Sequence, residues 1–285
     1  MKTFKSKVAV ITGAGNGIGQ ALALQLASQG ALTVLADISQ DAVGETAEKI
    51  HKLGGEAKAC VTDVSSREQM EALAAKVMAE EGRVDILINN AGVALSNVTV
   101  EKLSYTDMEW LFGINFWGVV HGTKAFLPHL MKREEASLVN VSSIYGLAAV
   151  AKSASYCASK FAVRGFTESL RQELKNTPVR VTVVHPGGVR SRIARNTRTA
   201  SNGDKIHDPK RAAAHFETIA RTTPEQAAAL IIDGIRREAP RVLIGGDAKF
   251  MDLLARLRPA GYDDFVLESI VTPSEKSYAD SDGRE

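Results

Sequence analysis

The chain has 285 residues, of which 45% are hydrophobic and 24% are charged, and its formal net charge is +2 at pH 7. This near balance excludes the strongly basic surface that a nucleic-acid-binding protein needs. No apolar stretch reaches the length of a membrane span, and the first residues lack the apolar core of a signal peptide. We therefore expect a soluble, cytoplasmic protein without a nucleic-acid or membrane partner.

Two cysteines, Cys60 and Cys157, are too few for a disulfide framework. We expect both to be small, buried, free thiols in a reducing compartment. The six histidines match no metal-binding spacing, so we expect no metal site. His185 is expected to be structural.

Seven short apolar segments alternate with helical patterns along the chain. Several of them are apolar on both faces, which is typical of parallel strands covered by helices on both sides. The pattern predicts an α/β fold, a single-domain Rossmann-type doubly wound seven-stranded parallel sheet over residues 1–270. The predicted strands are 8–12, 32–37, 57–62, 86–89, 138–142, 179–185 and 242–245.

The predicted helices begin and end at recognisable residues. A helix over 18–28 is followed by Gly30, which suits a helix C-terminus, and Pro224 suits the first position of a later helix. A long helix is predicted over 106–133. Pro128 lies inside it and predicts a kink or break near its end.

Three segments depart from this alternation. Residues 191–222 form a polar, arginine-rich insertion after the sixth strand, where ligands bind in such folds, and we expect a substrate lid there. Its arginines are interpreted as a solvated loop, with an anion site as the alternative. Residues 248–270 extend past the last strand and are expected to cover another subunit's pocket or to block one tetramer interface. The polar stretch 271–285 is expected to be a disordered tail.

A glycine-rich turn joins the first predicted strand directly to a helix. Phosphate groups need close approach to the backbone and free N–H donors, which such a turn supplies. The spacing departs from G-x-G-x-x-G, because Ile18 stands where the third glycine would fall. We expect this turn to bind a dinucleotide through Gly13, Gly15, Asn16, Gly17, Ile18 and Gly19.

Asp37 ends the second predicted strand, 18 residues beyond Gly19. A carboxylate there accepts hydrogen bonds from the adenosine ribose of NAD and repels the 2′-phosphate of NADP. Two unit charges ~4 Å apart interact by about 4 kcal/mol at an effective dielectric constant near 20. Ala14, Asn16 and Ile38 supply no compensating positive charge, so the sequence favours NAD over NADP. The alternative role for Asp37 is that of a helix N-cap.

Tyr156 and Lys160 stand four residues apart, which is one helical turn. This pair alone is weak evidence, because Tyr-x-x-x-Lys arises easily by chance. Other motifs stand in a fixed order around it: the glycine turn, Asn89-Asn90-Ala91-Gly92, Asn115, Ser143 and Pro186-Gly187. The ordered set resembles the short-chain dehydrogenase/reductase family, in the form called classical, from about residue 7 to about residue 245.

The resemblance implies further cofactor contacts. Asp63 and Val64 would meet the adenine ring, while Asn89 would brace neighbouring strands. Family members often have Thr at the position of Ser191, and Ser keeps the hydroxyl that can bond the nicotinamide carboxamide. The other implied residues are Asn90, Ala91 and Gly92 at the adenosine ribose, and Pro186, Gly187, Val189 and Ser191 at the nicotinamide.

The resemblance also assigns a catalytic set. Tyr156 would be the general acid/base, and its pKa near 10 would have to fall by ~3, which is about 4 kcal/mol, for work near neutral pH. The Lys160 ammonium and the positive ring of oxidised nicotinamide favour the phenolate. Lys160 would also bond the nicotinamide ribose, Ser143 would orient the substrate oxygen with Ser142 as its rival, and Asn115 would support a proton relay.

These observations predict a nicotinamide-dependent oxidoreductase for a small alcohol or ketone. A hydrophobic secondary alcohol or ketone is favoured, because the expected pocket lining is apolar, although Arg190 and Arg192 leave an acidic substrate open. The alternatives are an NADPH-dependent carbonyl reductase, a catalytically silent dinucleotide-sensing protein and a sugar-nucleotide epimerase or dehydratase. The apolar lining consists of Val93, Leu95, Leu147, Ala148 and Ala149.

The resemblance also implies a homodimer or homotetramer. In the family, the helices that correspond to 106–133 and 155–174 pack against their counterparts in other subunits. Burial within one subunit is the competing explanation for several of their aromatic residues. The aromatic residues concerned are Trp110, Phe112, Phe116, Trp117, Phe161 and Phe166.

Overall fold

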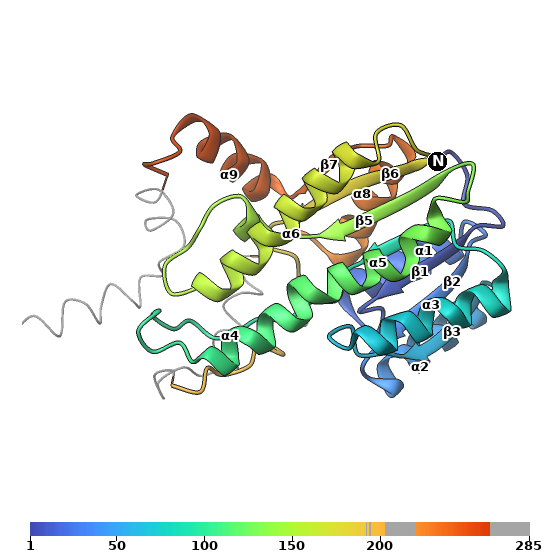
Figure 1. Ribbon diagram of the computed structural model, residues 1–285, viewed down its shortest axis with the longest axis horizontal. Helices are drawn as coiled ribbons and strands as arrows, with labels where there is room; N and C mark the ends of the chain where they lie inside the picture. The colour runs from blue at the N-terminus through green and yellow to red at the C-terminus, as the bar shows by residue number, and fades with distance from the viewer. Residues whose placement is uncertain (192, 194, 203–219, 263–285) are drawn as a thin grey trace, which may run out of the picture.

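A computed structural model describes residues 1–191, 193, 195–202 and 220–262 (Figure 1). In this part of the chain, seven parallel strands form one sheet in the order β3-β2-β1-β4-β5-β6-β7. The predicted doubly wound fold is therefore confirmed, with strand ends that shift by one or two residues. The strands are β1 Val8–Thr12, β2 Leu32–Asp37, β3 Glu56–Val61, β4 Ile86–Asn89, β5 Ala136–Val141, β6 Val179–Pro186 and β7 Arg241–Ile244.

Helices fill the connections between the strands. Ser66 caps α3 by accepting a hydrogen bond from the Gln69 N–H, and Thr223 forms a capping box at the start of α8. Gly30 has a φ of +83°, as expected beyond the end of α1. The helices are α1 Gly17–Ala27, α2 Gln40–Lys52, α3 Arg67–Glu81, α4 Tyr105–Phe112, α5 Gly118–Leu130, α6 Ala154–Glu173, α8 Pro224–Arg236 and α9 Gly246–Leu257.

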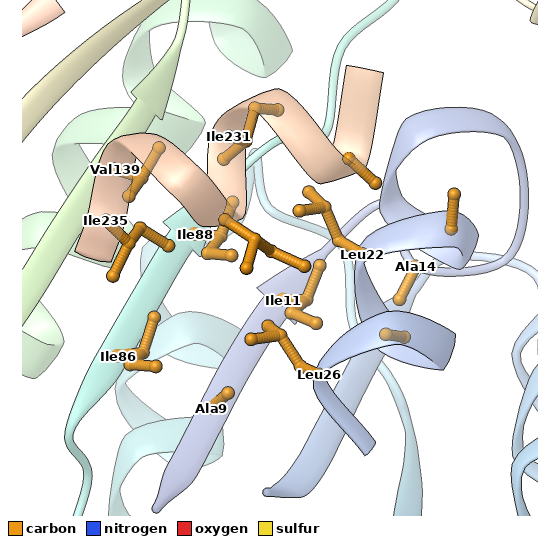
Figure 2. Packing of buried hydrophobic residues seen from close by; sticks show 14 of the residues in the cluster. Ala9, Ile11, Ala14, Leu22, Leu26, Ile86, Ile88, Val139, Ile231 and Ile235 are labelled. Carbon is orange, nitrogen blue, oxygen red and sulfur yellow. The ribbon is translucent and has the colours of Figure 1, made fainter. Parts of the chain in front are cut away.

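One face of the sheet packs against α1, α2 and α8. Figure 2 shows Ile11 of β1 and Ile88 of β4 beneath Leu22 of α1 and Ile231 of α8. All four side chains are fully buried. Successive side chains of a strand point to opposite faces of the sheet, so every second residue of each strand packs against this helical layer.

The opposite face packs against α3, α5 and α6. Val8 and Val10 of β1 point to this side, where they share a cluster with Leu73, Phe126 and Leu170 from the three helices. Two-sided burial explains why β1 is apolar at all its positions except Thr12.

A buried polar network joins this helical layer to the sheet. The Asn89 amide donates to Asn140 Oδ1 at 2.9 Å, and the Asn140 amide donates to Thr167 Oγ1 of α6 at 3.0 Å. All three residues are buried. The bonds tie β4, β5 and α6 together immediately below the sheet edge, in agreement with the bracing role expected of Asn89.

The long helix predicted over 106–133 differs from the observed structure. It is divided by a π-helical turn, η1, over Gly113–Trp117, and α5 ends at Leu130, two residues beyond Pro128. The interruption therefore lies around Asn115, far before the proline. A π turn carries an extra residue per turn, and such turns often occur at functional sites.

The described part of the C-terminal segment, residues 246–262, packs against the same chain. Helix α9 lies beyond β7, at the edge of the sheet (Figure 1). Its Met251 is buried with Ala148, and Tyr262 lies in the same cluster. The expected contact with another subunit stays a prediction. The expected tail 271–285, residues 263–270 of the expected extension, and residues 192, 194 and 203–219 of the expected lid lie outside the described residues.

A buried carboxylate anchors the amino end of β4. Asp85 is fully buried, accepts the Val8 N–H at 2.9 Å, and pairs with Arg83 at 2.6 Å and Arg133 at 3.2 Å. Burial acts to raise the pKa of Asp85, but the hydrogen bonds from Arg83 and Val8 outweigh it, and the pKa is lowered overall. Asp85 therefore stabilises the fold as an anion.

We expect Asp85→Asn to lower the free energy of unfolding by about 2–3 kcal/mol near neutral pH, because a buried carboxylate with two partly exposed partners is lost. The folded pKa of Asp85 lies below its unfolded value, about 3.9. Its contribution is therefore complete above that pH and is lost as the pH falls through the folded pKa. Urea denaturation at several pH values, with the exposed Glu45→Gln as control, measures this. An equal difference at neutral and acidic pH would contradict it.

Candidate active site

The polar motifs meet at the carboxyl edge of the sheet, where β1, β4, β5 and β6 end. Thr12 Oγ1 accepts the N–H groups of Asn90 and Ala91, each at 3.0 Å. The Asn90 amide donates to Thr12 O at 2.9 Å and Gly13 O at 3.2 Å. The Asn90 side chain therefore holds the glycine turn against the end of β4. Thr12 is a bracing residue that the predicted site did not include.

The glycine turn has the conformation of a phosphate-binding loop. Gly13 and Gly17 have φ values of +64° and +54°, which favour glycine. A Cβ on Gly13 would lie 2.8 Å from Ala91 Cα, and one on Gly19 would overlap the carbonyl oxygen of Gly13. The backbone of the turn therefore packs directly against Ala91 and against itself, with no room for side chains at Gly13 and Gly19. The turn presents its backbone, free of side chains at these positions, at the N-terminus of α1. The geometry fits the pyrophosphate of a dinucleotide.

Asp37 lies against this turn. Its Oδ2 accepts the Gly15 N–H at 2.9 Å, and its Oδ1 accepts the Ser39 N–H at 3.1 Å. The N-cap of α2 is Ser39, which accepts the Ala42 N–H, so the alternative role of Asp37 as a helix cap is wrong. Each carboxylate oxygen has a further lone pair for a ribose hydroxyl.

The residues after β3 have local partners. The Asp63 carboxylate accepts the backbone N–H of Ser65 at 2.9 Å and its hydroxyl at 2.7 Å. Val64 is buried against the position of Gly118, where a Cβ would lie 2.8 Å from the valine side chain. Its carbonyl lies 3.1 Å from His121 Nδ1. These contacts fix the strand end.

The turn after β6 is held by a carboxylate that the sequence analysis missed. Asp247, in the first turn of α9, accepts the Gly188 N–H at 2.6 Å. A Cβ on Gly187 would overlap its carboxylate. Ser191 lies against Gly17, 3.1 Å from the position of a Cβ there, and Val189 is buried. The sequence signal that could have indicated this contact is Asp247 itself, which directly follows the pair Gly245-Gly246 at the end of the last strand.

Ser143 and Ser142 have separate surroundings. The Ser142 hydroxyl is buried and donates to the Lys160 carbonyl at 2.8 Å. Ser143 begins the 3₁₀ turn η2, Ile144–Gly146, and its Oγ accepts the Tyr145 N–H at 3.2 Å. The Ser143 side chain lies close enough to Tyr156 to act on its pKa, which it lowers through a hydrogen bond. The structure thus brings Ser143 to the tyrosine and engages Ser142 in packing.

Tyr156 and Lys160 face each other on α6. The Lys160 Nζ lies 5.7 Å from the centre of the Tyr156 ring and donates to Val141 O at 3.2 Å. Burial raises the pKa of Tyr156 to about 12, against the opposing hydrogen bond with Ser143, and burial lowers the pKa of Lys160 to about 8. In the chain without cofactor, desolvation therefore outweighs the opposing hydrogen bond with Ser143. The lowering of the tyrosine pKa expected with oxidised nicotinamide bound stays a prediction.

Asn115 is buried at the π turn. Its Oδ1 accepts the Val93 N–H at 2.8 Å, and its Nδ2 donates to Val93 O at 3.0 Å and to Ser159 Oγ at 3.3 Å. A Cβ on Gly92 would lie 3.2 Å from Asn115 Oδ1 and 3.3 Å from Lys160 Nζ. Asn115 and Lys160 therefore converge beside Gly92.

The remaining candidates are structural. His185 is buried, with Nδ1 3.0 Å from Ser143 O, and burial lowers its pKa to about 4. Arg190 donates to Ala220 O at 3.0 Å, and Arg198 lies over the Trp110 ring. Both cysteines are buried free thiols, as predicted. Within the described ranges, no group of three or more His, Cys, Asp or Glu could hold a metal ion, and none of the helices is long and apolar enough to cross a bilayer.

The expected pocket lining is only partly accessible. Leu147 and Ala148 are buried, and Ala148 packs against Met251 of α9. The Tyr262 hydroxyl accepts the Ala149 N–H at 3.0 Å. Helix α9 and Tyr262 therefore support the turn after Ser143 from behind, which the sequence analysis did not predict.

The aromatic helices combine packing with exposure. Phe116 contacts Phe166 edge to face, with ring centroids 6.2 Å apart. Trp117 is 51% exposed and Phe161 is 38% exposed. Burial within the chain thus accounts for some of these rings and leaves Trp117 and Phe161 at the surface.

The fold, the glycine turn and the convergent polar residues define a dinucleotide-binding α/β protein. A family model described as short chain dehydrogenase matches residues 7–202. The chain is 43% identical to the oxidoreductase SadH of Mycobacterium tuberculosis, over 95% of this chain and 97% of the relative. It is 32% identical to estradiol 17-beta-dehydrogenase 11 of Mus musculus, over 90% and 82% respectively.

A solved structure has the same architecture. A short-chain dehydrogenase/reductase from Burkholderia phymatum in complex with NAD matches with a TM-score of 0.83 and 31% identity, over 92% of this chain and 97% of that one. The chain belongs to the short-chain dehydrogenase/reductase family. It is an NAD(P)-dependent oxidoreductase.

Two helical glycines provide a matched test of the turn. Gly19→Ala places a Cβ on the Gly13 carbonyl, so we expect about 1–3 kcal/mol of destabilisation and NADH binding weakened at least tenfold. Gly44 in α2 has nothing within 4 Å of its Cβ position. Gly44→Ala should raise stability by about 0.5–1 kcal/mol through helix propensity and leave binding unchanged. Thermal unfolding and NADH fluorescence measure both, and equal behaviour of the two variants would refute the packing argument.

Proposed function

We propose that this protein is an NAD-dependent dehydrogenase that interconverts a hydrophobic secondary alcohol and its ketone. Tyr156 is the general acid/base, Ser143 orients the substrate oxygen, and Lys160 and Asn115 support proton movement. The observation that carries the proposal is the convergence of Ser143, Tyr156 and Lys160, with Lys160 Nζ beside Gly92, directly after the Asn90–Ala91 pair that holds the glycine turn. The bound cofactor supplies the hydride donor or acceptor and, when oxidised, a positively charged ring.

Residues of one sheet edge hold the cofactor in this proposal. The turn from Gly13 to Gly19 binds the pyrophosphate, and Asp37 binds the adenosine ribose. The two hydrogen bonds that Asp37 accepts orient its carboxylate beside the turn. Further contacts come from the adenine side at Asp63 and Val64, the ribose side at Asn90, Ala91 and Gly92, and the nicotinamide side at Pro186, Gly187, Val189 and Ser191.

The chain also favours NAD by what it lacks near Asp37. A Cβ on Gly15 would lie 2.8 Å from Asp37 Oδ2, so the turn itself occupies the space beside the carboxylate. A 2′-phosphate would lie against an anion there, with no lysine or arginine among Ala14, Asn16 and Ile38. The NAD complex of the Burkholderia phymatum relative also supports this choice.

Proton transfer at the substrate oxygen falls to Tyr156. With a pKa raised to about 12 by burial, the phenol is protonated at neutral pH and can donate to a ketone oxygen. The Ser143 hydroxyl bonds the same oxygen and stabilises charge that develops on it. In alcohol oxidation, Tyr156 instead accepts the proton. The charge that makes this possible must come from Lys160 and the bound oxidised cofactor.

Lys160 and Asn115 form the inner end of the proton path. Burial lowers the pKa of Lys160 to about 8, so its ammonium can lose and regain a proton near neutral pH. Its Nζ and Asn115 Oδ1 both border Gly92. A water bound between these groups would pass the proton outward, and the peptide of Val93 orients Asn115 for this task.

The substrate is a hydrophobic secondary alcohol or ketone. Val93, Leu95 and Ala149 are the apolar side chains assigned to the lining of this site. Of the two arginines that would recognise an acid, Arg190 donates to the Ala220 carbonyl and Arg192 lies outside the described residues. The relative named estradiol 17-beta-dehydrogenase 11 supports an apolar alcohol by its name. We further propose a cytoplasmic homodimer or homotetramer built from a single domain over 1–270, and the exposed Trp117 and Phe161 support the oligomer.

Cofactor titration tests the role of Asp37. Followed by nicotinamide fluorescence, NADH should bind at least tenfold more tightly than NADPH, which is about 1.4 kcal/mol. Asp37→Asn removes the charge and should reduce this ratio to about threefold or less. Asp41→Asn, an exposed aspartate four residues further on, should keep it. NADPH preference in the natural protein would make it an NADPH-dependent carbonyl reductase, and binding of neither cofactor would contradict the whole proposal.

Tyr156→Phe tests the chemistry. Removal of the hydroxyl should lower kcat by about 10²–10⁴-fold with NAD and a reactive secondary alcohol from a screen, because proton transfer is lost. The affinity for NADH should change less than about threefold. Tyr145→Phe is the matched control, since its ring lies 5.7 Å from that of Tyr156. Should Tyr156→Phe retain full turnover, or the natural protein bind NADH without turnover, the assigned chemistry is wrong.

A further inference from the structure

A second polar cleft lies away from the carboxyl edge of β1 and β4, between α6, the β6–β7 edge and α9. It has a volume of about 480 Å³. Arg164, Glu168 and Arg171 line it from α6, at positions that share one helix face. Val183 and Arg241, paired in register across β6 and β7, form its floor, and Arg256 of α9 completes the wall.

The charges in this cleft do not balance. Asp252 pairs with Arg241 and, at 3.2 Å, with Arg256. Glu168 pairs with Arg164 at 3.1 Å. Four arginines against two carboxylates leave a formal charge of +2. Arginine stays protonated in proteins, so this excess cannot be relieved by loss of a proton.

Two donor groups in the cleft lack acceptors. In the part of the chain that the structure describes, Arg171 forms no hydrogen bond or ion pair, and the buried Nε of Arg241 has no acceptor. Burial lowers the pKa of Arg241; Asp252 offsets this in part, and the charges of Arg164 and Arg256 lower it further. A buried guanidinium N–H without an acceptor is costly, and an anion is the ligand that satisfies it.

The cleft is joined to the turn that carries Ser143. Arg164 Nη1 donates to the Gly146 carbonyl of η2 at 3.3 Å. The buried His185 contacts the Ser143 carbonyl through Nδ1, and its Nε2 has no partner in the described chain. The charges of Arg241, Arg164 and Glu168 act on His185. A ligand bound at Arg164 would therefore lie next to the contacts that hold the Ser143–Gly146 turn.

We propose that this arginine cleft binds a small molecule bearing a doubly charged phosphate group, at a site separate from the dinucleotide. A phosphate dianion matches the excess charge of the cleft. Its oxygens can accept from the free guanidinium of Arg171 and from the Nε of Arg241, and planar guanidinium groups bind phosphate in a forked geometry. The cleft has room for an organic group beyond the phosphate.

Isothermal titration calorimetry with inorganic phosphate, and in parallel with pyrophosphate, tests the proposal on the full chain. Measurements are made with and without saturating NADH, because the glycine turn can also bind phosphate. We expect binding that persists with NADH and weakens at least tenfold in the double variant Arg171→Gln/Arg256→Gln. The variant should fold normally, since Arg171 is exposed and Arg256 is 62% exposed.

Arg237→Gln is the matched control. Like Arg256, Arg237 is an exposed arginine, at 66%, and it pairs with an aspartate one helical turn before it. It should bind phosphate as the natural protein does. Three results would overturn the proposal: no heat with either anion, equal binding by the double variant, or a change of oligomeric state in the double variant without phosphate binding. The last result would instead assign the arginines to an interface between copies.

Discussion

The parallel direction of all seven strands is the constraint on which the site depends. In a parallel sheet, every carboxyl end lies at the same edge, so residues that follow different strands meet without any contact in sequence. Gly13 follows β1, Asp37 ends β2, Gly92 follows β4 and Ser143 follows β5. Two-sided burial holds this arrangement, because alternate residues of each strand anchor a separate helical layer.

Polar bonds fix the edge in detail, since apolar packing alone does not orient a backbone. Thr12 and Asn90 join the ends of β1 and β4 through four hydrogen bonds. The Asn89–Asn140–Thr167 network performs the same task one layer below. Apart from Asn89 Oδ1, which has no partner among the described residues, the side-chain groups of these bonds are satisfied by protein partners. The glycine turn is thereby held in its open shape without side chains inside it.

The electrostatics of the active site show a conflict between burial and reactivity. Desolvation favours the neutral forms of both Tyr156 and Lys160, so the pKa of the phenol rises and that of the ammonium falls. The phenol of Tyr156 is therefore protonated at neutral pH in the chain by itself, which suits the proton donation proposed for it. In the proposed mechanism, alcohol oxidation needs positive charge brought in with the oxidised cofactor, which would couple the protonation state of Tyr156 to the oxidation state of the nicotinamide ring.

The sequence by itself determined where the strands lie, that they are buried on both faces, and which motifs stand at their ends. These features follow from local periodicity, glycine positions and spacing. The family's spacing to Tyr156 favoured Ser143 over its rival Ser142, and strand alternation points the two in different directions. Only the tertiary structure decided the π turn at Asn115, the support of Gly188 by Asp247, the raised pKa of Tyr156 and the arginine cleft. Each of these depends on residues distant in sequence, or on burial, and neither is encoded in a local pattern.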